Sequence, residues 1–260
     1  MLRNNGSFLS ATDQLQRTIT CSLMDKKLLE ATSRGDVKRI QRYVHLGADI
    51  NTFNREGDTP LSIAALRGHV QAVRALVIEL GGFVNTLNYY TDATPAFSAA
   101  YKGHVKVVEE LAELGANLNR ADTNGATPTH IAAQEGHAGV IKALAQHEAI
   151  IDAVDNNGAT PAHIAAQAGH IEVLNVLAEH GANLNIATAA GWTPVLAAAR
   201  QGHTRVVKLL YTLGANMTPD FHCTLKEVAQ RYEQSEVVTL VESIFHKIRR
   251  AERRMAVVTL

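Results

Sequence analysis

Histidine is the residue of this 260-residue chain best suited to binding a metal or transferring protons, and the chain has twelve of them. His130 and His137 are seven residues apart, and His163 and His170 repeat that spacing. A zinc site needs three or four ligands that converge on one point, whereas this spacing arises from a repeated segment that distributes the histidines along the chain. We therefore expect no metal site and no cofactor, and interpret the histidines as hydrogen-bonding groups at helix ends.

Known catalytic motifs are missing. The chain has no glycine-rich phosphate loop, no dinucleotide-binding fingerprint, no His-Glu-x-x-His and no Gly-x-Ser-x-Gly. Asp122, Asp152 and Asp155 lie in or beside expected loops, where aspartate side chains commonly stabilise turns. We therefore expect no enzymatic activity and no catalytic residues.

The composition is typical of an ordered, soluble protein, with 46% hydrophobic and 19% charged residues and a formal net charge of zero. No apolar run approaches the roughly 18 residues that cross a membrane, and the zero net charge does not favour nucleic acid as a partner. Residues 1–23 are polar and lack a secretory signal, so we expect a polar leader on an intracellular, cytoplasmic protein. Cys21 and Cys223 lie near opposite ends, which predicts stability from packing rather than disulfides.

The dipeptide Thr-Pro recurs along the chain, and a Gly-His pair follows each copy eight residues after the proline. The spacing between the later copies is 33 residues. A unit this short cannot bury its own apolar face, so the copies must stack on one another in a line. The copies are Thr59-Pro60, Thr94-Pro95, Thr127-Pro128, Thr160-Pro161 and Thr193-Pro194.

The third copy, NGATPTHIAAQEGH from Asn124, shows how one unit is built. Thr127 is a suitable N-cap, Pro128 suits the first helical turn, and Gly136 suits a left-handed helix end. A second helix follows, with apolar residues at helical spacing, and a Gly-Ala pair ends it in most units. The pattern predicts helix, turn, helix and loop in every unit. The apolar residues of the second helix are Val140, Ile141 and Leu144.

These residues resemble the ankyrin repeats, whose unit has 33 residues and begins Thr-Pro-Leu-His. The resemblance implies an all-α solenoid of helix-turn-helix units joined by loop or β-hairpin-like tips. It places an ankyrin-repeat domain at residues 24–245, with an N-terminal cap at 24–51, five repeats at 52–219 and a C-terminal cap at 220–245. The family histidine is present as His130 and His163. Ser62, Phe97 and Leu196 replace it elsewhere, so those units are expected to lack one inter-repeat hydrogen bond.

The second Thr-Pro lies 35 residues after the first, and we place the extra residues around Gly81-Gly82 and in the loop at residues 88–92. In ankyrin-like stacks, the loop tips and the exposed part of the first helix form a concave surface that contacts protein partners. Tyrosine, tryptophan and arginine often dominate binding energy at such surfaces. By register, the candidate partner-binding residues are Arg55, Arg67, Tyr89, Tyr90, Tyr101, Lys102, Gln134, Glu135, Trp192 and Arg200.

Structural roles compete with this interpretation. Tyr89 and Tyr90 can fold back on their own loop, and Tyr101 can cover a helix end. Trp192 can fill the groove between the fourth and fifth units instead of meeting a partner. The sequence leaves both alternatives open.

Residues 246–260 form a basic amphipathic segment, expected to be a C-terminal helix or tail. One interpretation is that its apolar stripe packs on the last repeat while the charges are solvated. The alternatives are contact with an acidic partner or a membrane surface, a nuclear import signal, or contact with nucleic acid, which the zero net charge of the chain disfavours. The basic residues are Lys247, Arg249, Arg250, Arg253 and Arg254.

The third unit ends in His147-Glu148-Ala149, where other units have Gly-Ala. A non-glycine residue held at positive φ costs on the order of 1 kcal/mol. We therefore expect Glu148→Gly to stabilise the domain.

The expected function is non-enzymatic protein binding by a monomer that acts as an adaptor, a scaffold or an inhibitor by occupancy. The resemblance is to a family used in eukaryotic signalling and ubiquitin-ligase adaptors, and also in proteins that intracellular bacteria deliver into host cells. An effector delivered into a host cell is therefore an alternative, as is a protein targeted by its basic tail. The identity of the partner is left open.

Overall fold

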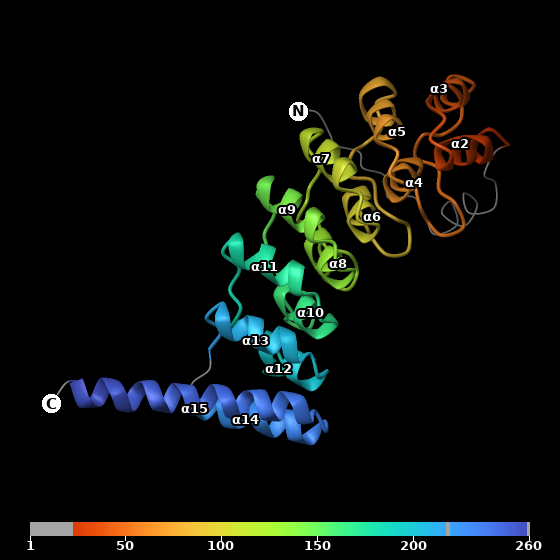
Figure 1. Ribbon diagram of the computed structural model, residues 1–260. Coiled ribbons are helices and arrows are strands. Elements are labelled where there is room, and N and C mark those ends of the chain that lie inside the picture. The colour runs from red at the N-terminus through yellow and green to blue at the C-terminus, as the bar shows by residue number, and fades with distance from the viewer. Residues whose placement is uncertain (1–22, 217–218, 259–260) are drawn as a thin grey trace, which may run out of the picture.

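The computed structural model describes residues 23–216 and 219–258, and every regular element in that part of the chain is a helix. Each Thr-Pro begins a short inner helix, and each Gly-His leads into an outer helix. We number the five Thr-Pro copies as units one to five. The predicted all-α solenoid is confirmed, and Figure 1 shows the stack bending toward the side of the inner helices.

Inner and outer helices alternate along the chain. The N-terminal cap contains α2 (Leu23–Ser33) and α3 (Val37–His45). The inner helices of units one to five are α4 (Pro60–Leu66), α6 (Pro95–Tyr101), α8 (Pro128–Gln134), α10 (Pro161–Ala168) and α12 (Pro194–Arg200). Their outer helices are α5 (Val70–Arg74) continued by the π-helix η1 (Ala75–Glu79), α7 (Val105–Glu113), α9 (Ala138–Gln146), α11 (Ile171–Glu179) and α13 (Thr204–Thr212). The C-terminal pair is α14 (Pro219–Arg231) and α15 (Ser235–Val258).

The inner helices begin where the Thr-Pro pattern predicts. The proline occupies the first helical turn of all five, where its missing N–H costs nothing and its φ is already helical. In units one, two and four, the threonine hydroxyl accepts a hydrogen bond of 3.2 Å from the backbone N–H three residues later. The cap thus satisfies one of the otherwise unpaired amides at each of these helix starts.

The core is a ladder of equivalent residues rather than one globular centre. A small alanine lets each inner helix approach its neighbours closely, and a leucine fills the space between successive outer helices. All of these side chains are buried. The alanines are Ala64, Ala99, Ala132, Ala165 and Ala198, and the leucines are Leu76, Leu111, Leu144, Leu177 and Leu210.

The Gly-His histidines connect each unit to the one before it. In every case the ring Nε2 donates to a backbone carbonyl near the end of the preceding first helix, at 2.9 to 3.1 Å. The ring also lies over the preceding unit's glycine: a Cβ added to Gly136 would lie 2.9 Å from the ring of His170. Glycine at this position therefore permits both the left-handed turn and the contact. The pairs are His69 with Ser33, His104 with Leu66, His137 with Tyr101, His170 with Gln134 and His203 with Gln167.

Unit one was expected to lack the inter-repeat bond of the family histidine, and Ser62 instead bonds to Thr59 of its own unit. Its Ser62 cannot bridge the units as a histidine does, but the Thr59 hydroxyl pairs with the Thr86 hydroxyl at 3.0 Å. Thr86 lies beyond the outer helix, 27 residues along the chain. The first interface thus has a different polar contact in place of the histidine bond.

The two extra residues between the first and second Thr-Pro are absorbed at two places. One lies in the outer helix of unit one, where α5 and η1 have five residues each against nine in α7. A π-turn is the usual way for a helix to accommodate one inserted residue, so this insertion lies before Gly81-Gly82, where it was expected. The other enlarges the loop tip, where Asp92 takes a left-handed φ of 56°.

The end helices cover the stack. α2 and α3 pack on the inner and outer helices of unit one, and α14 and α15 pack on α12 and α13. α15 runs without a break through the predicted boundary between residues 245 and 246, and its C-terminal half extends past the repeats (Figure 1). Residues 1–22 of the predicted leader lie outside the described residues.

No helix in residues 23–216 and 219–258 combines the length and the apolar character that crossing a bilayer requires.

Candidate partner-binding surface

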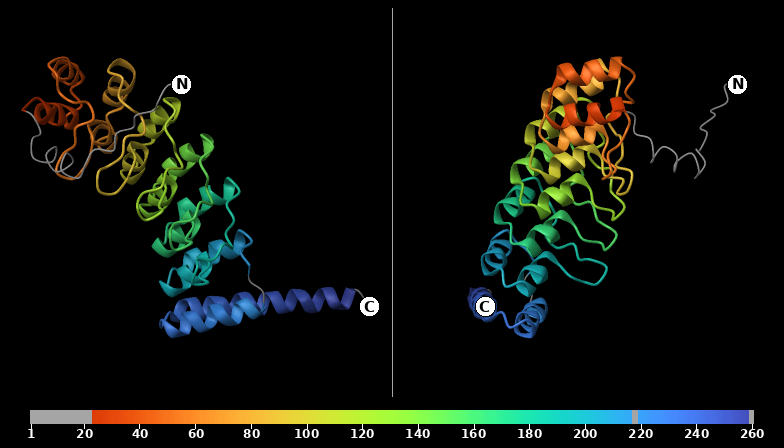
Figure 2. Two further views of the ribbon diagram at one scale, coloured as in Figure 1. Left: turned by 180° about the vertical axis from the view of Figure 1, so that it is seen from behind. Right: turned by 90° about the vertical axis from the view of Figure 1, so that its right-hand side faces the viewer.

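The loop tips and the exposed ends of the inner helices form one continuous surface, which we call the concave surface. The tips project on one side of the stack, as Figure 2 shows. Each tip is tied to the previous one by a backbone hydrogen bond, such as Asn156 N–H to Asn124 O (3.1 Å) and Ala189 N–H to Asn157 O (2.9 Å). These bonds fix the spacing of the tips, so side chains on adjacent units keep a defined separation.

Aspartate side chains hold the tips of units three and four in shape. Asp155 Oδ1 accepts from the backbone N–H groups of Asn157 and Ala159, both at 2.8 Å, and Asp122 makes the equivalent bonds in unit three. Asp152 accepts from the Asn183 N–H of the following unit. Asp122 and Asp155 thus stabilise their own turns, as the sequence indicated, whereas Asp152 links two units.

An aromatic cluster lies at the tips of units one and two. Tyr89 stacks on Phe53 with ring centroids 5.1 Å apart, and Tyr90 meets Tyr89 edge to face at 5.0 Å. Tyr89 and Tyr90 nevertheless remain 45% and 56% exposed. We call these three residues the tyrosine cluster. Its members contact one another, as the structural interpretation predicted, and still present apolar area to a partner.

Tyr101 lies apart from this cluster, at the end of α6. Its ring carries the Lys102 ammonium group, whose Nζ lies 4.4 Å from the ring centroid. Among the described side chains, neither Lys102 nor the exposed Arg55 and Arg67 forms an ion pair. The N-terminal part of the concave surface therefore combines exposed aromatic rings with exposed positive charge.

The middle of the concave surface is polar. Gln134 and Glu135 end α8, both are exposed, and the Gln134 amide lies 3.5 Å from the Glu135 carboxylate. The Gln134 backbone carbonyl is already occupied by His170. The exposed side chains of Gln134 and Glu135 are the groups that this part of the surface offers to a partner.

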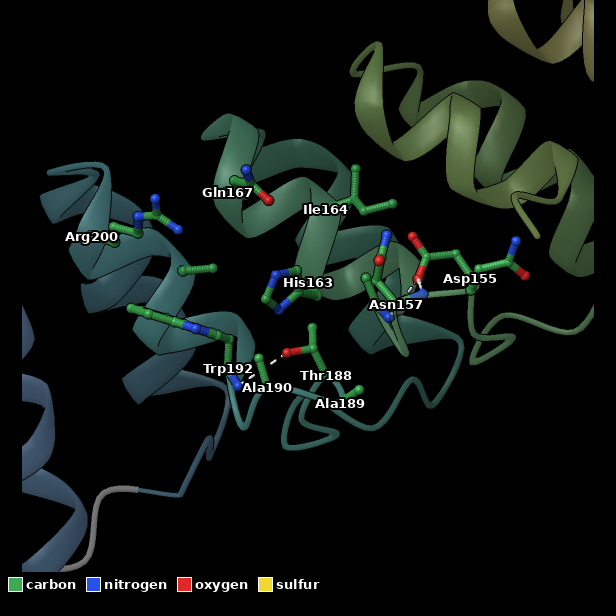
Figure 3. Close-up of a pocket in the computed structure, with 13 residues that line it drawn as sticks. Asp155, Asn157, His163, Ile164, Gln167, Thr188, Ala189, Ala190, Trp192 and Arg200 are labelled. Atoms are coloured by element: carbon green, nitrogen blue, oxygen red, sulfur yellow. Dashed lines mark hydrogen bonds between the residues drawn. The ribbon is translucent and has the colours of Figure 1, made fainter. Parts of the chain in front are cut away.

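At the C-terminal end, Arg200 lies between two aromatic rings. Its guanidinium carbon is 5.3 Å from the Trp192 ring centroid and 5.1 Å from that of Tyr232. Trp192 is half-buried and packs against the core, while its ring also lines a hollow between units four and five (Figure 3). Trp192 thus fills the groove and contributes to the surface at once. We call Trp192, Arg200 and Tyr232 the Arg200 stack.

Two histidines lie beneath this surface with lowered pKa. Burial lowers the pKa of His130, partly opposed by its backbone bond to Ala159 and by the charges of Asp155 and Asp122. Burial likewise lowers the pKa of His163, opposed by a backbone bond with Trp192 and by Asp155. His130 Nε2 donates to Ala159 O at 3.0 Å, across the interface to unit four. Both groups favour the neutral form and serve packing.

Among the side chains that the structure describes, in residues 23–216 and 224–250, no three from His, Cys, Asp or Glu are grouped so that they could hold a metal ion.

The basic residues of the predicted tail lie on the projecting helix α15. Lys247, Arg249 and Arg250 are exposed, and the Arg249 guanidinium lies 4.1 Å from the Phe245 ring centroid. Arg253 and Arg254 lie on the same helix beyond the last side chain that the structure describes.

Two aromatic residues of this surface were not predicted from the sequence. Phe53 lies at the start of the first repeat, before its Thr-Pro, and Tyr232 follows α14 in the C-terminal cap. Tyr232 could have been found by extending the register one unit further, because it occupies the cap position equivalent to Gln201.

Comparison with known proteins gives a consistent picture. Residues 28–122 and 115–188 match the family model "Ankyrin repeats (3 copies)", and residues 190–220 match the model "Ankyrin repeat". The chain is similar to the human ASB11 ankyrin repeat domain, with a TM-score of 0.66 and 30% identity over 74% of this chain and 85% of that one.

Curated relatives are similar over the repeats alone. Cyclin-dependent kinase 4 inhibitor B of Mus musculus is 35% identical over 101 residues, which are 39% of this chain and 76% of the relative. A probable E3 ubiquitin-protein ligase, XBOS33 of Oryza sativa subsp. japonica, is 31% identical over 107 residues, which are 40% of this chain and 20% of the ligase. The inactive serine/threonine-protein kinase TEX14 of Mus musculus is 31% identical over 108 residues, which are 42% of this chain and 7% of TEX14. The alignments to the last two thus span a fifth or less of each relative.

Proposed function

The chain belongs to the ankyrin-repeat family, and we propose that it is a non-enzymatic module that holds a protein partner along its concave surface, with the tyrosines of unit two as the anchor. The repeats indicate a protein-protein interaction module. The structurally similar domain and the kinase inhibitor match this chain in its repeats, which is why the repeats are the natural place to look for the site.

The half-exposed tyrosine cluster carries the proposal. Large aromatic side chains that remain accessible on a rigid surface supply much binding energy when a partner desolvates them. The tip that bears Tyr89 and Tyr90 is longer than the others, and its backbone bond from Tyr89 N–H to Gly57 O (2.9 Å) holds it on unit one. The anchor is therefore prominent and fixed in place.

The test is to replace Tyr89, Tyr90 and Tyr101 together with alanine and to measure which cell proteins the chain captures. We expect loss of the specific partners, because each tyrosine that a partner covers at a binding hot spot contributes about 2 kcal/mol to the free energy of binding. A matched control replaces three exposed apolar residues elsewhere, Leu46, Ile78 and Leu213, with alanine. Capture of every specific partner by the tyrosine variant would defeat this placement of the anchor.

A second candidate function rests on α15. Its exposed Lys247, Arg249 and Arg250 project beyond the repeats, where a basic helix can attract an acidic protein or a membrane surface. Deleting residues 246–260 separates the two functions. Loss of cellular location with full partner capture supports targeting by the helix, whereas an unchanged location removes this candidate.

A further inference from the structure

Two aromatic rings, and not a carboxylate, hold the Arg200 guanidinium in place. The Trp192 and Tyr232 rings lie 5.3 Å and 5.1 Å from its guanidinium carbon and come from different parts of the stack. Stacking on aromatic faces restricts the planar guanidinium but leaves its N–H groups at the edge available. Among the described residues, Arg200 forms no ion pair. The group is thus pre-oriented and accessible.

Arg74 shows the contrasting case within the same chain. It donates from two nitrogens to the two carboxylate oxygens of Glu110, at 2.8 and 2.9 Å, across the outer helices of units one and two. This arrangement is the one that a guanidinium favours with a carboxylate. Arg200 has the same donors on the opposite side of the stack, and no carboxylate from the described residues meets them.

The hollow beside Arg200 has room for part of a partner. It has a volume of ≈ 390 Å³, within the range of about 300 to 1,000 Å³ typical of binding pockets. Trp192, Ile164 and Ala197 contribute its apolar wall. Figure 3 shows Arg200 and Asp155 at opposite ends of the residues that line it.

The two ends differ in charge, which gives the hollow a direction. Arg200 offers positive charge at one end. Asp155 is negative at the other, where its Oδ1 is already engaged by two backbone N–H groups of the tip. A segment with a carboxylate at the Arg200 end and a neutral or basic residue at the Asp155 end matches both charges. A segment with acids at both ends does not.

We propose that this hollow binds an extended peptide segment of the protein partner, and that an aspartate or glutamate of that segment pairs with Arg200 while a neighbouring apolar side chain covers Trp192. The inference rests on the proposed function, because it names the chemistry of the partner at one part of the concave surface. A carboxylate desolvated against a stacked guanidinium forms a charge-assisted pair. This pair would give specificity at the C-terminal end, far from the tyrosine cluster.

The test uses a phage-displayed library of random dodecapeptides selected on the full chain. We expect aspartate and glutamate to be enriched at one position of the selected peptides, next to an apolar residue. The best peptide is then synthesised with a fluorescent label, and its Kd is measured by fluorescence polarisation against Arg200→Gln, Arg200→Lys and Arg205→Gln. Arg205 is an exposed arginine on the outer helix α13, so its variant loses the same charge on another face.

Arg200→Gln is expected to weaken binding about tenfold or more, and Arg200→Lys to weaken it less, since lysine keeps the charge but lacks the planar fork. Arg205→Gln is expected to leave Kd unchanged. Replacing the peptide's acidic residue with its amide should weaken binding as much as Arg200→Gln does. Combining the two changes should weaken binding little further, because both remove the same pair. Because Arg200 is exposed, its variants should keep the helical circular dichroism of the parent chain.

Selected peptides without acidic enrichment, or equal binding by Arg200→Gln, overturn the inference. If such peptides depend instead on Tyr89, Tyr90 and Tyr101, the proposed function stands and only the inference fails. A library that yields no binder sensitive to any concave-surface variant counts against both.

Discussion

Units three and four are near copies, and their comparison shows how much a neighbour decides. From Asn124 and Asn157 onward, the two 14-residue segments differ only at Thr129/Ala162 and Glu135/Ala168. Both inner helices begin at the proline of their Thr-Pro and bury equivalent alanines. Their surroundings differ. Unit three has the near-identical unit four beside it, whereas unit four faces the tip of unit five, which bears Trp192.

The family histidine responds to this difference. His130 uses both ring nitrogens: Nδ1 contacts the Thr127 hydroxyl at 2.8 Å and accepts from its N–H at 3.2 Å, while Nε2 donates to Ala159 O. His163 has a buried Nδ1 with no hydrogen-bond partner among the described residues. Its side chain also lines the hollow beside the Arg200 stack. Equal sequence therefore does not give equal hydrogen bonding.

The largest expected effect tests whether the two units are equal in their apolar cores. Leu144 and Leu177 occupy equivalent positions and both are 0% exposed. Leu144→Ala and Leu177→Ala should each lower the free energy of unfolding by about 2 to 5 kcal/mol, and by similar amounts. Urea denaturation followed by circular dichroism measures both. A large inequality would mean that the cores differ as well as the hydrogen bonds.

The next effect separates the histidines. His130→Ala removes bonds at both ring nitrogens, whereas His163→Ala removes a ring that makes fewer bonds. The same atoms are deleted in both variants, so the difference reports the hydrogen bonds. We expect His130→Ala to be more destabilising by about 1 kcal/mol, again by urea denaturation. Equal losses would contradict the difference in bonding.

The pH dependence follows from the lowered pKa of both histidines. Below the ordinary histidine pKa of about 6.5, the unfolded chain binds protons that the folded chain does not. The free energy of unfolding should therefore be fully retained above this pH and fall as the pH decreases toward the lowered folded pKa. Each histidine can change the free energy of unfolding by at most about 1.4 kcal/mol for each unit of pH.

The measurement is a series of urea titrations between pH 7.5 and 5.5, in the parent chain and in the His130→Ala/His163→Ala double variant. The double variant should show a shallower decline. An identical decline in both proteins would assign the pH dependence to other groups.

The smallest effect concerns the ends of the two outer helices. Glu148 ends unit three with a left-handed φ of 60°, where unit four has Gly181 at 83°. Most other units have glycine at this position, which the repeat pattern indicated. Because glycine adopts a positive φ without strain, Glu148→Gly should raise the free energy of unfolding by about 1 kcal/mol. Gly181→Ala is the matched reverse change, because a Cβ there meets nothing within 4 Å and only the backbone conformation is strained. A Glu148→Gly variant with an unchanged or lower denaturation midpoint would refute the assignment of strain.

Much of the fold could be predicted from the sequence because its determinants are local. Thr-Pro begins a helix and Gly-His ends it through backbone conformations that need only a few adjacent residues. Repetition then makes stacking the only way to bury the apolar faces. The site was predicted less completely. Register identified Tyr89 and Trp192, but not Phe53, which precedes the first Thr-Pro, or Tyr232, which lies in the C-terminal cap.

The sequence by itself determined where the inner helices begin, the order of the units and the positions that need glycine, since each follows from local conformational preference and from a repeated apolar pattern. Tertiary structure decided which histidine forms all of its bonds, where η1 absorbs an inserted residue, and how Arg200 comes to lie between Trp192 and Tyr232. These features depend on distances between side chains of different units. Such distances are set only when the units pack.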